Sequence, residues 1–280
     1  NVISIYSNGS SMLEQQATLL SSVSWEFLEA DIDNLTVGVI CSVAPKEYTA
    51  ETEAAIVIDG MEHPMTLSGG SFVSKIKIPL LDEAHASQVI FREGDAVRTE
   101  ALDWHLSARY DYLPNVSADF SGSSTGSPRD GVYTYDCDGV VTVHADCKQP
   151  NEIKAVTLVE VLSGETLGRT NIPLDNAEFF ANYRAGNGAP EPAMQIGGSS
   201  QTGPFYYALD KKYEIPFSGT LTLYVEVEDG NGLFYRSIIA HEEISGSGEP
   251  AGDHGWWMGM EASIYDANGN ALFNPYPSLY

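Results

Sequence analysis

The residues whose types could carry chemistry are three cysteines, six histidines and a large excess of acidic side chains. Cys41, Cys137 and Cys147 match no zinc or redox spacing. The histidines are spread along the chain with no pair four residues apart and no cysteine cluster, so the sequence predicts no metal site and no cofactor. A catalytic carboxylate pair is defined by its separation in space, which the sequence does not give. We therefore expect a protein that is not an enzyme.

Two motifs resemble functional loops but lack the context that the chemistry needs. Gly122–Gly126 fits the G-x-S-x-G pattern of an esterase, yet we expect it in a loop rich in serine and glycine, without the strand and helix that expose the nucleophile. Asp266–Gly269 resembles the start of a calcium loop, but Ala271 stands where an EF-hand requires glycine. We expect a hairpin turn there.

The strongly negative charge of the chain argues against negatively charged partners. The 280 residues include 39 acidic and 14 basic side chains, for a formal charge of −25. Such a field repels phosphate backbones and anionic lipids, so we expect neither nucleic acid nor a membrane surface as a partner. The chain has no apolar run long enough to cross a bilayer and begins at Asn1 without a signal-like segment. We interpret it as a mature or trimmed fragment, whose membrane attachment, if any, depends on sequence outside this chain.

An internal repeat organises the chain, because four short segments recur in the same order. The pairs are Val23–Phe27 with Val116–Phe120, Leu35–Pro45 with Val140–Pro150, Ala55–Ile58 with Ala155–Leu158, and Gln88–Leu102 with Tyr224–Ile238. Each match is weak alone, but their shared order predicts two copies of one fold.

The segments between turns predict β-strands rather than helices. Leu223–Val227 alternates apolar and polar residues and leads into Asp229–Gly232, whose residues suit a tight hairpin. Glu93–Asp95 predicts the equivalent hairpin of the first copy, and Asp138–Gly139 predicts a further one. That last turn would hold Cys137 about 20 Å from Cys147, so we expect free thiols. Met12–Leu20 predicts a short helix or an extended leader.

This strand pattern, with a closing hairpin and an acidic Gly-Asn turn, resembles the tandem immunoglobulin-like β-sandwich modules of bacterial cell-surface proteins over about residues 22 to 245. The resemblance implies an all-β fold, an extracellular or cell-surface location and no catalytic residues. The expected organisation is an N-terminal leader (1–21), sandwich 1 (22–112), sandwich 2 (113–245) with an insertion at about 175–205, and a flexible linker with a C-terminal hairpin (246–280).

Three functions fit this organisation. The first is a non-enzymatic surface module that binds an unknown protein or glycan, or that spaces another domain from the membrane. The second is the sensory ectodomain of a membrane-anchored regulator, and the third is an accessory region of a secreted carbohydrate-active enzyme. The residues before Asn1 would distinguish them.

The insertion of the second copy is the candidate interaction surface. About 35 to 40 extra residues lie between Leu174 and Phe205, longer than most loops and rich in aromatic residues. Tyrosines combine an apolar ring with a polar tip and favour interfaces, so we predict Tyr183 with Tyr206 or Tyr207 as contacts, and buried phenylalanines. The alternative, that these rings close the open end of the sandwich or extend its sheet, stays open.

Overall fold

The computed structural model describes residues 18–177, 179–180, 203–256 and 259–277, which form two compact units. Unit 1 comprises Asn1–Tyr112 and unit 2 comprises Leu113–Tyr280. Both are built from antiparallel strands, which confirms the predicted all-β class. The predicted helix or leader at Met12–Leu20 lies mostly outside the described residues. Within the described ranges, no helix has the length and apolar character that crossing a bilayer requires.

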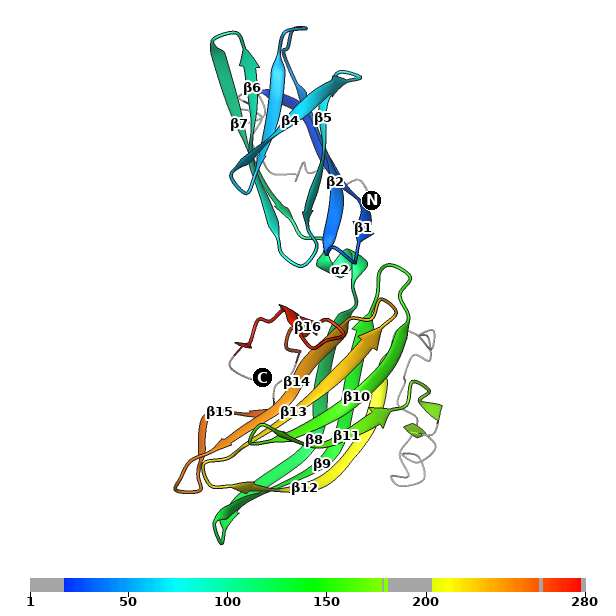
Figure 1. Cartoon of the computed structure of the whole chain (residues 1–280), viewed down its shortest axis with the longest axis vertical. Coiled ribbons are helices and arrows are strands. Elements are labelled where there is room, and N and C mark those ends of the chain that lie inside the picture. Colours follow the sequence, from blue (N-terminus) through cyan, green and yellow to red (C-terminus); the bar gives the residue numbers. More distant parts are fainter. Residues whose placement is uncertain (1–17, 178, 181–202, 257–258, 278–280) are drawn as a thin grey trace. The chain divides into compact units, whose positions relative to one another are not determined.

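Unit 1 contains seven strands and one short helix (Figure 1). These are β1 (Leu20–Asp31), β2 (Thr36–Pro45), β3 (Glu53–Ile58), β4 (Met61–Ser68), β5 (Ser71–Pro79), β6 (Ala84–Glu93), β7 (Ala96–Leu106) and α2 (Arg109–Tyr112). The strands follow the order β1-β2-β5-β4-β3-β6-β7, in which β4 pairs with both β5 and β3. On β2, alternate side chains from Val37 to Val43 are fully buried, as expected of a strand with one face in a core.

Unit 2 contains ten described strands, of which the first seven correspond in order to the seven strands of unit 1 (Figure 1). These are β8 (Asn115–Arg129), β9 (Val132–Asp146), β10 (Ile153–Leu162), β11 (Glu165–Ile172), β12 (Phe205–Pro216), β13 (Thr220–Asp229), β14 (Phe234–Ile244), β15 (Pro250–Trp256), β16 (Ser263–Tyr265) and β17 (Ala271–Phe273). One sheet has the order β8-β9-β12, and the other runs β11-β10-β13-β14-β16-β17 with β15 also on β14.

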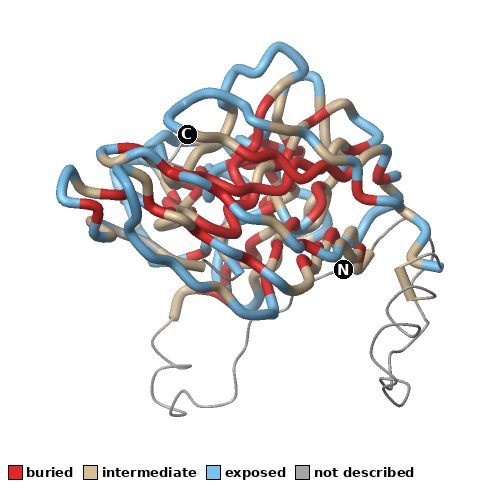
Figure 2. The backbone as a smooth tube through the Cα atoms, turned by 90° about the horizontal axis from the view of Figure 1, so that it is seen from below, coloured by how far each residue is buried: buried red, intermediate tan, exposed pale blue. Residues whose placement is uncertain are grey.

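The four repeated sequence segments fall on strands of the same rank in the two units. They lie on β1 and β8, on β2 and β9, on β3 and β10, and on the hairpins β6–β7 and β13–β14. In both units the first, second and fifth strands are neighbours, and the fourth, third, sixth and seventh follow one another. Along these strands buried residues alternate with more exposed ones, and Figure 2 shows the burial of each described residue along the backbone.

Three predicted hairpins are confirmed, and one is wrong. The turns at Glu93–Asp95, Asp229–Gly232 and Asp266–Gly269 each join antiparallel strands. Asp138–Gly139, in contrast, lies inside β9. The turn that joins β8 to β9 is Asp130–Gly131, where both residues have positive φ, 50° and 86°.

Gly139 serves close packing instead of a turn. It faces Gly122 across the β8–β9 ladder, and a Cβ on Gly139 would lie 2.5 Å from the Ser121 carbonyl oxygen and 2.7 Å from the Gly122 Cα. The buried residues Tyr135, Cys137 and Val141 alternate through this point and keep the strand continuous. Glycine here marks a close approach of two backbones, which a local turn pattern cannot distinguish.

Two further expectations differ from the structure. Gly122–Gly126 lies within strand β8 and not in a loop, so the strand-to-helix elbow of an esterase is absent at this position. Residues 246–252 are not a free linker, because Ser245 N donates to the Glu249 carbonyl and Pro250 begins β15, which pairs with β14. The short turn that reverses the chain needs the small residues that also characterise linkers.

Candidate functional site

Tyr206 and Tyr207 lie at the start of β12 but on opposite faces of it. Successive side chains of a strand alternate, and Tyr207 lies on the same side as the buried Phe205 and Leu209. Tyr206 therefore faces outward, opposite Thr142 of β9. The structure separates the two tyrosines, so Tyr206 is the available contact on the outer face. Tyr183 lies outside the described residues.

Two rings gather around Tyr206, and together the three residues form what we call the aromatic cluster (Phe179, Phe180 and Tyr206). Phe179 stacks on Tyr206 with ring centroids 5.4 Å apart, and Phe180 meets Tyr206 edge-on at the same separation. All three are half-buried, and burial raises the pKa of Tyr206. Phe205 is buried as predicted, whereas Phe179 and Phe180 are not.

The aromatic cluster is fixed by hydrogen bonds at the base of the insertion. Asn176 Nδ2 donates to the Pro204 carbonyl at 2.8 Å, and Phe180 N donates to the Asn176 carbonyl at 3.0 Å. These bonds hold the segment before the cluster against the start of β12. The rings thus have a defined place beside the sheet.

The outer face of the β8-β9-β12 sheet continues from Tyr206 with small side chains. Asp119 and Thr142 stand in register with Tyr206, and the next row holds Ser121, Val140 and Ala208. These short side chains are half-buried or exposed, and Tyr206 with the rest of the aromatic cluster lies at one end of their rows.

A second cluster lies inside unit 2, between its two sheets. Glu160 of β10 accepts hydrogen bonds from Lys211 Nζ at 2.7 and 2.8 Å and from the Tyr213 hydroxyl at 2.5 Å, both on β12. The Glu160 side chain is only 5% exposed, and Gly168 opposite it leaves the space that its carboxylate occupies. Burial, with the Glu160 carboxylate, raises the pKa of Tyr213. These groups satisfy one another, so their role is to join the two sheets.

In unit 1 the structure brings together two histidines that are distant in sequence. His85 of β6 pairs with His105 of β7, and Asp103 lies beside both. Within the described residues, His85, Asp103 and His105 are the group whose side chains could hold a metal ion. The expected absence of a metal site rested on helical spacing between histidines, whereas this pair forms across two strands.

A signal for this pair was present in the sequence. His85 lies eight residues before Glu93 and His105 nine residues after Ala96, and Glu93 and Ala96 are the pair that closes the predicted hairpin. A one-residue shift between Ala86 and Gln88 brings the histidines into register. Counting outward from a turn thus places them together to within one residue.

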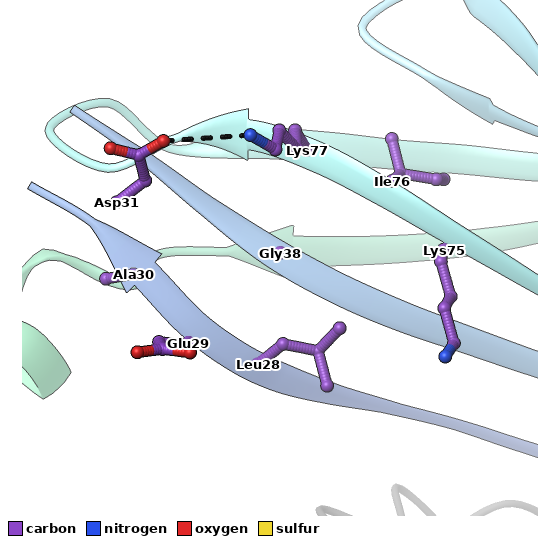
Figure 3. Close-up of a pocket in the computed structure, with 8 residues that line it drawn as sticks. All are labelled: Leu28, Glu29, Ala30, Asp31, Gly38, Lys75, Ile76 and Lys77. Carbon is purple, nitrogen blue, oxygen red and sulfur yellow. Dashed lines mark ion pairs between the residues drawn. The ribbon is translucent and has the colours of Figure 1, made fainter. Parts of the chain in front are cut away.

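An open hollow also lies on the β1-β2-β5 face of unit 1 (Figure 3). Gly38 of β2 forms its floor, with Leu28 on one side and Lys75 on the other. Asp31 pairs with Lys77 at 3.7 Å across its end, and both side chains are solvent-exposed. The hollow arises because Gly38 has no side chain, and its charges neutralise one another, so it carries no specific chemistry.

Comparison with known proteins found no match: no family model fits the sequence, and neither a curated protein nor a solved structure matches the chain.

Proposed function

We propose that the chain is a non-enzymatic, extracytoplasmic cell-surface module, built from two immunoglobulin-like sandwiches, that binds a glycan through unit 2. The order of seven antiparallel strands, the same in both units, supports the immunoglobulin-like assignment. A location outside the cytoplasm agrees with the resemblance to tandem surface modules.

The aromatic cluster beside a face of short side chains, among them Asp119, Ser121 and Thr142, is the observation that carries the proposal. Aromatic rings offer apolar faces to the CH groups of a sugar, and hydroxyl side chains offer hydrogen bonds to its OH groups. Tyr206 contributes both properties at the border of the outer face, where Thr142 and Asp119 stand in register with it. A flat polar surface with a ring at its edge suits an extended polysaccharide better than a compact ligand, which requires a concave pocket.

The test is a glycan array, followed by affinity measurements with the polysaccharide that the full chain retains. We expect Tyr206→Ala to weaken binding about tenfold or more, because the ring supplies a stacking contact of roughly 1 kcal/mol and its hydroxyl a hydrogen bond. Deleting Ala177–Thr202 removes the other two rings and should abolish binding. Tyr48→Ala in unit 1 is the matched control for loss of a half-exposed tyrosine and should bind like the wild type.

Circular dichroism of each variant establishes that the fold is retained. Equal affinity of Tyr206→Ala and the wild type would reject the site, and an array with no retained glycan would reject the function.

A further inference from the structure

A three-residue group at the ends of β6 and β7 combines two imidazoles and a carboxylate. His85 and His105 are direct cross-strand partners, and their ring centroids lie 5.0 Å apart with an interplanar angle of 30°. Asp103 has a φ of 53°, in the left-handed region that aspartate tolerates better than most residues. Its carboxylate thereby meets both rings, although all three residues belong to only two strands.

The donor atoms already stand close to the spacing of a metal site. His85 Nε2 lies 3.0 Å and His105 Nε2 3.8 Å from Asp103 Oδ1, and all the ligand atoms lie within 4.8 Å of one another. Tetrahedral zinc, with bonds of about 2.0–2.1 Å, separates its ligand atoms by about 3.4 Å. Side-chain rotations alone can reach that spacing because the three side chains are 45%, 84% and 59% exposed, for His85, Asp103 and His105 respectively.

An outer carboxylate orients one of the imidazoles for coordination. His105 Nδ1 lies 2.7 Å from Glu83 Oε1. A carboxylate at this distance fixes the proton on Nδ1 and leaves the lone pair of Nε2 facing Asp103 and His85. Metal-bound histidines are commonly held by such a carboxylate, which sets the tautomer and the ring orientation. An ordinary surface ion pair does not require this alignment of two rings.

We propose that His85, Asp103 and His105 form a binding site for a divalent transition-metal ion, zinc foremost, with Glu83 as the positioning residue. Two imidazole nitrogens and one carboxylate oxygen are ligands that zinc favours, whereas calcium takes only oxygen. The exposure of the three side chains leaves a coordination position for water. Bound zinc would join the ends of β6 and β7 beyond the irregularity at Ala86–Gln88.

The experiment is a calorimetric zinc titration of the full chain after treatment with a chelator. We expect one specific ion per chain, with affinity reduced at least about hundredfold in His85→Ala and in His105→Ala. Glu83→Gln should weaken binding about tenfold without changing the stoichiometry, because it loosens the His105 ring but removes no ligand. The matched controls are His63→Ala, in the same unit, and His144→Ala, whose Nε2 lies 3.8 Å from Asp119 Oδ2 and which belongs to no metal-binding group among the described residues.

A second measurement does not depend on substitutions. Cobalt added to the wild-type protein should give visible absorption bands typical of a four-coordinate N/O site, and zinc but not calcium should abolish them. Zinc binding that is equal in the wild type and His85→Ala, or that calcium displaces, would show adsorption to the acidic surface and overturn the proposal. Loss of binding in His63→Ala equal to that in His85→Ala would do so too.

Discussion

The fourth and fifth strands are connected differently in the two units. The connection joins β4 to β5 in unit 1 and β11 to β12 in unit 2. In unit 1, Gly69 and Gly70, with φ of 59° and 89°, form a two-residue turn, and β4 pairs directly with β5. In unit 2 the connection spans residues 173–204, and β11 pairs with β10 while β12 pairs with β9.

Within the described residues β11 and β12 are not paired, and side chains of β10 and β12 join the two sheets of unit 2 instead. Glu160 of β10 binds Lys211 and Tyr213 of β12 and so joins the two sheets. Among the described residues, every buried carboxylate lies in unit 2, whereas the buried polar residues of unit 1 are Thr52 and Ser74. Unit 1 thus has continuous backbone pairing where unit 2 has two sheets joined by a buried polar cluster, and the stability of such a cluster depends on protonation.

The largest expected difference between the units is in alkaline solution. Burial raises the pKa of three tyrosines and one cysteine in unit 2 far above their usual values: Tyr135, Cys137, Tyr213 and Tyr235. In unit 1 burial raises the pKa of Cys41 to about 12, and it raises that of Tyr112. The folded state keeps these protons above pH 9–10, where the unfolded chain loses them, so stability falls as the pH rises.

At pH 11 we expect unit 2 to have lost roughly 3 kcal/mol more than unit 1, because each group contributes about 1.4 kcal/mol per pH unit above its unfolded pKa. Pulsed thiol labelling along a urea series, read by mass spectrometry, reports unit 1 through Cys41 and unit 2 through Cys137. Both cysteines are fully buried in the folded protein. A urea midpoint for Cys137 that falls no further between pH 7 and pH 11 than the midpoint for Cys41 would contradict the prediction.

The second-largest expected effect on stability comes from the Glu160 carboxylate, which lies between the two sheets of unit 2. Glu160→Ala should destabilise unit 2 by about 3 kcal/mol, because the Tyr213 hydroxyl and the partly exposed Lys211 lose their acceptor. The variant Glu160→Leu/Lys211→Met/Tyr213→Phe replaces the whole cluster with apolar groups and should recover most of that loss. Urea unfolding with labelling at Cys137 measures both.

The matched control is Glu62→Ala in unit 1, which removes an ion pair with Arg92 whose side chains are 39% and 49% exposed. We expect it to stay close to the wild type, since exposed pairs contribute little. The role of Glu160 is refuted if its alanine variant unfolds no more easily than this control.

The smallest expected effect on stability is the difference between two glycine substitutions, one on the second strand of each unit. Gly139→Ala would place a Cβ against the backbone of β8 and should cost about 2 kcal/mol. A Cβ on Gly38, in contrast, would lie 3.1 Å from the Leu28 Cβ, so β1 would need to move by only a few tenths of an ångström beside an open hollow (Figure 3). We expect Gly38→Ala to change stability by about 0.5 kcal/mol in either direction. Equal losses in thermal unfolding would show that the close approach of β8 and β9 is not rigid.

The sequence predicts those features whose causes are local. The turn at Asp229–Gly232 could be predicted because its own residues determine the backbone, and Asp229 accepts hydrogen bonds from Asn231 N and Leu233 N within it. Gly139 was misassigned because its partner, Gly122, is distant in sequence. Local pattern therefore predicted the strands better than it predicted which glycines end them.

The candidate sites, too, could be predicted only where their causes are local in the sequence. The aromatic composition indicated Tyr206, but only strand alternation in the folded chain separates it from Tyr207. To predict that His85 and His105 are neighbours, one must count residues outward from the turn between β6 and β7. The count must also include a register shift that no local sequence pattern indicates. Glu160, Lys211 and Tyr213 were not predicted, because they meet across two sheets and no single strand pattern connects them.

The extra strands of unit 2 also affect how chains associate with one another. Strand β14 is covered by β15 and β16, whereas β7, its counterpart in unit 1, ends its sheet within the described residues. An uncovered strand presents free N–H and C=O groups to a strand of another molecule, which is the usual beginning of aggregation. Arg98 places a charge on β7 and opposes such pairing, while the Glu100 carboxylate accepts hydrogen bonds from Thr18 Oγ1 and Leu19 N. Of these two corresponding strands, β7 is therefore the one whose charges the protein needs to stay soluble. High salt screens these charges, so aggregation through β7 should increase with salt concentration.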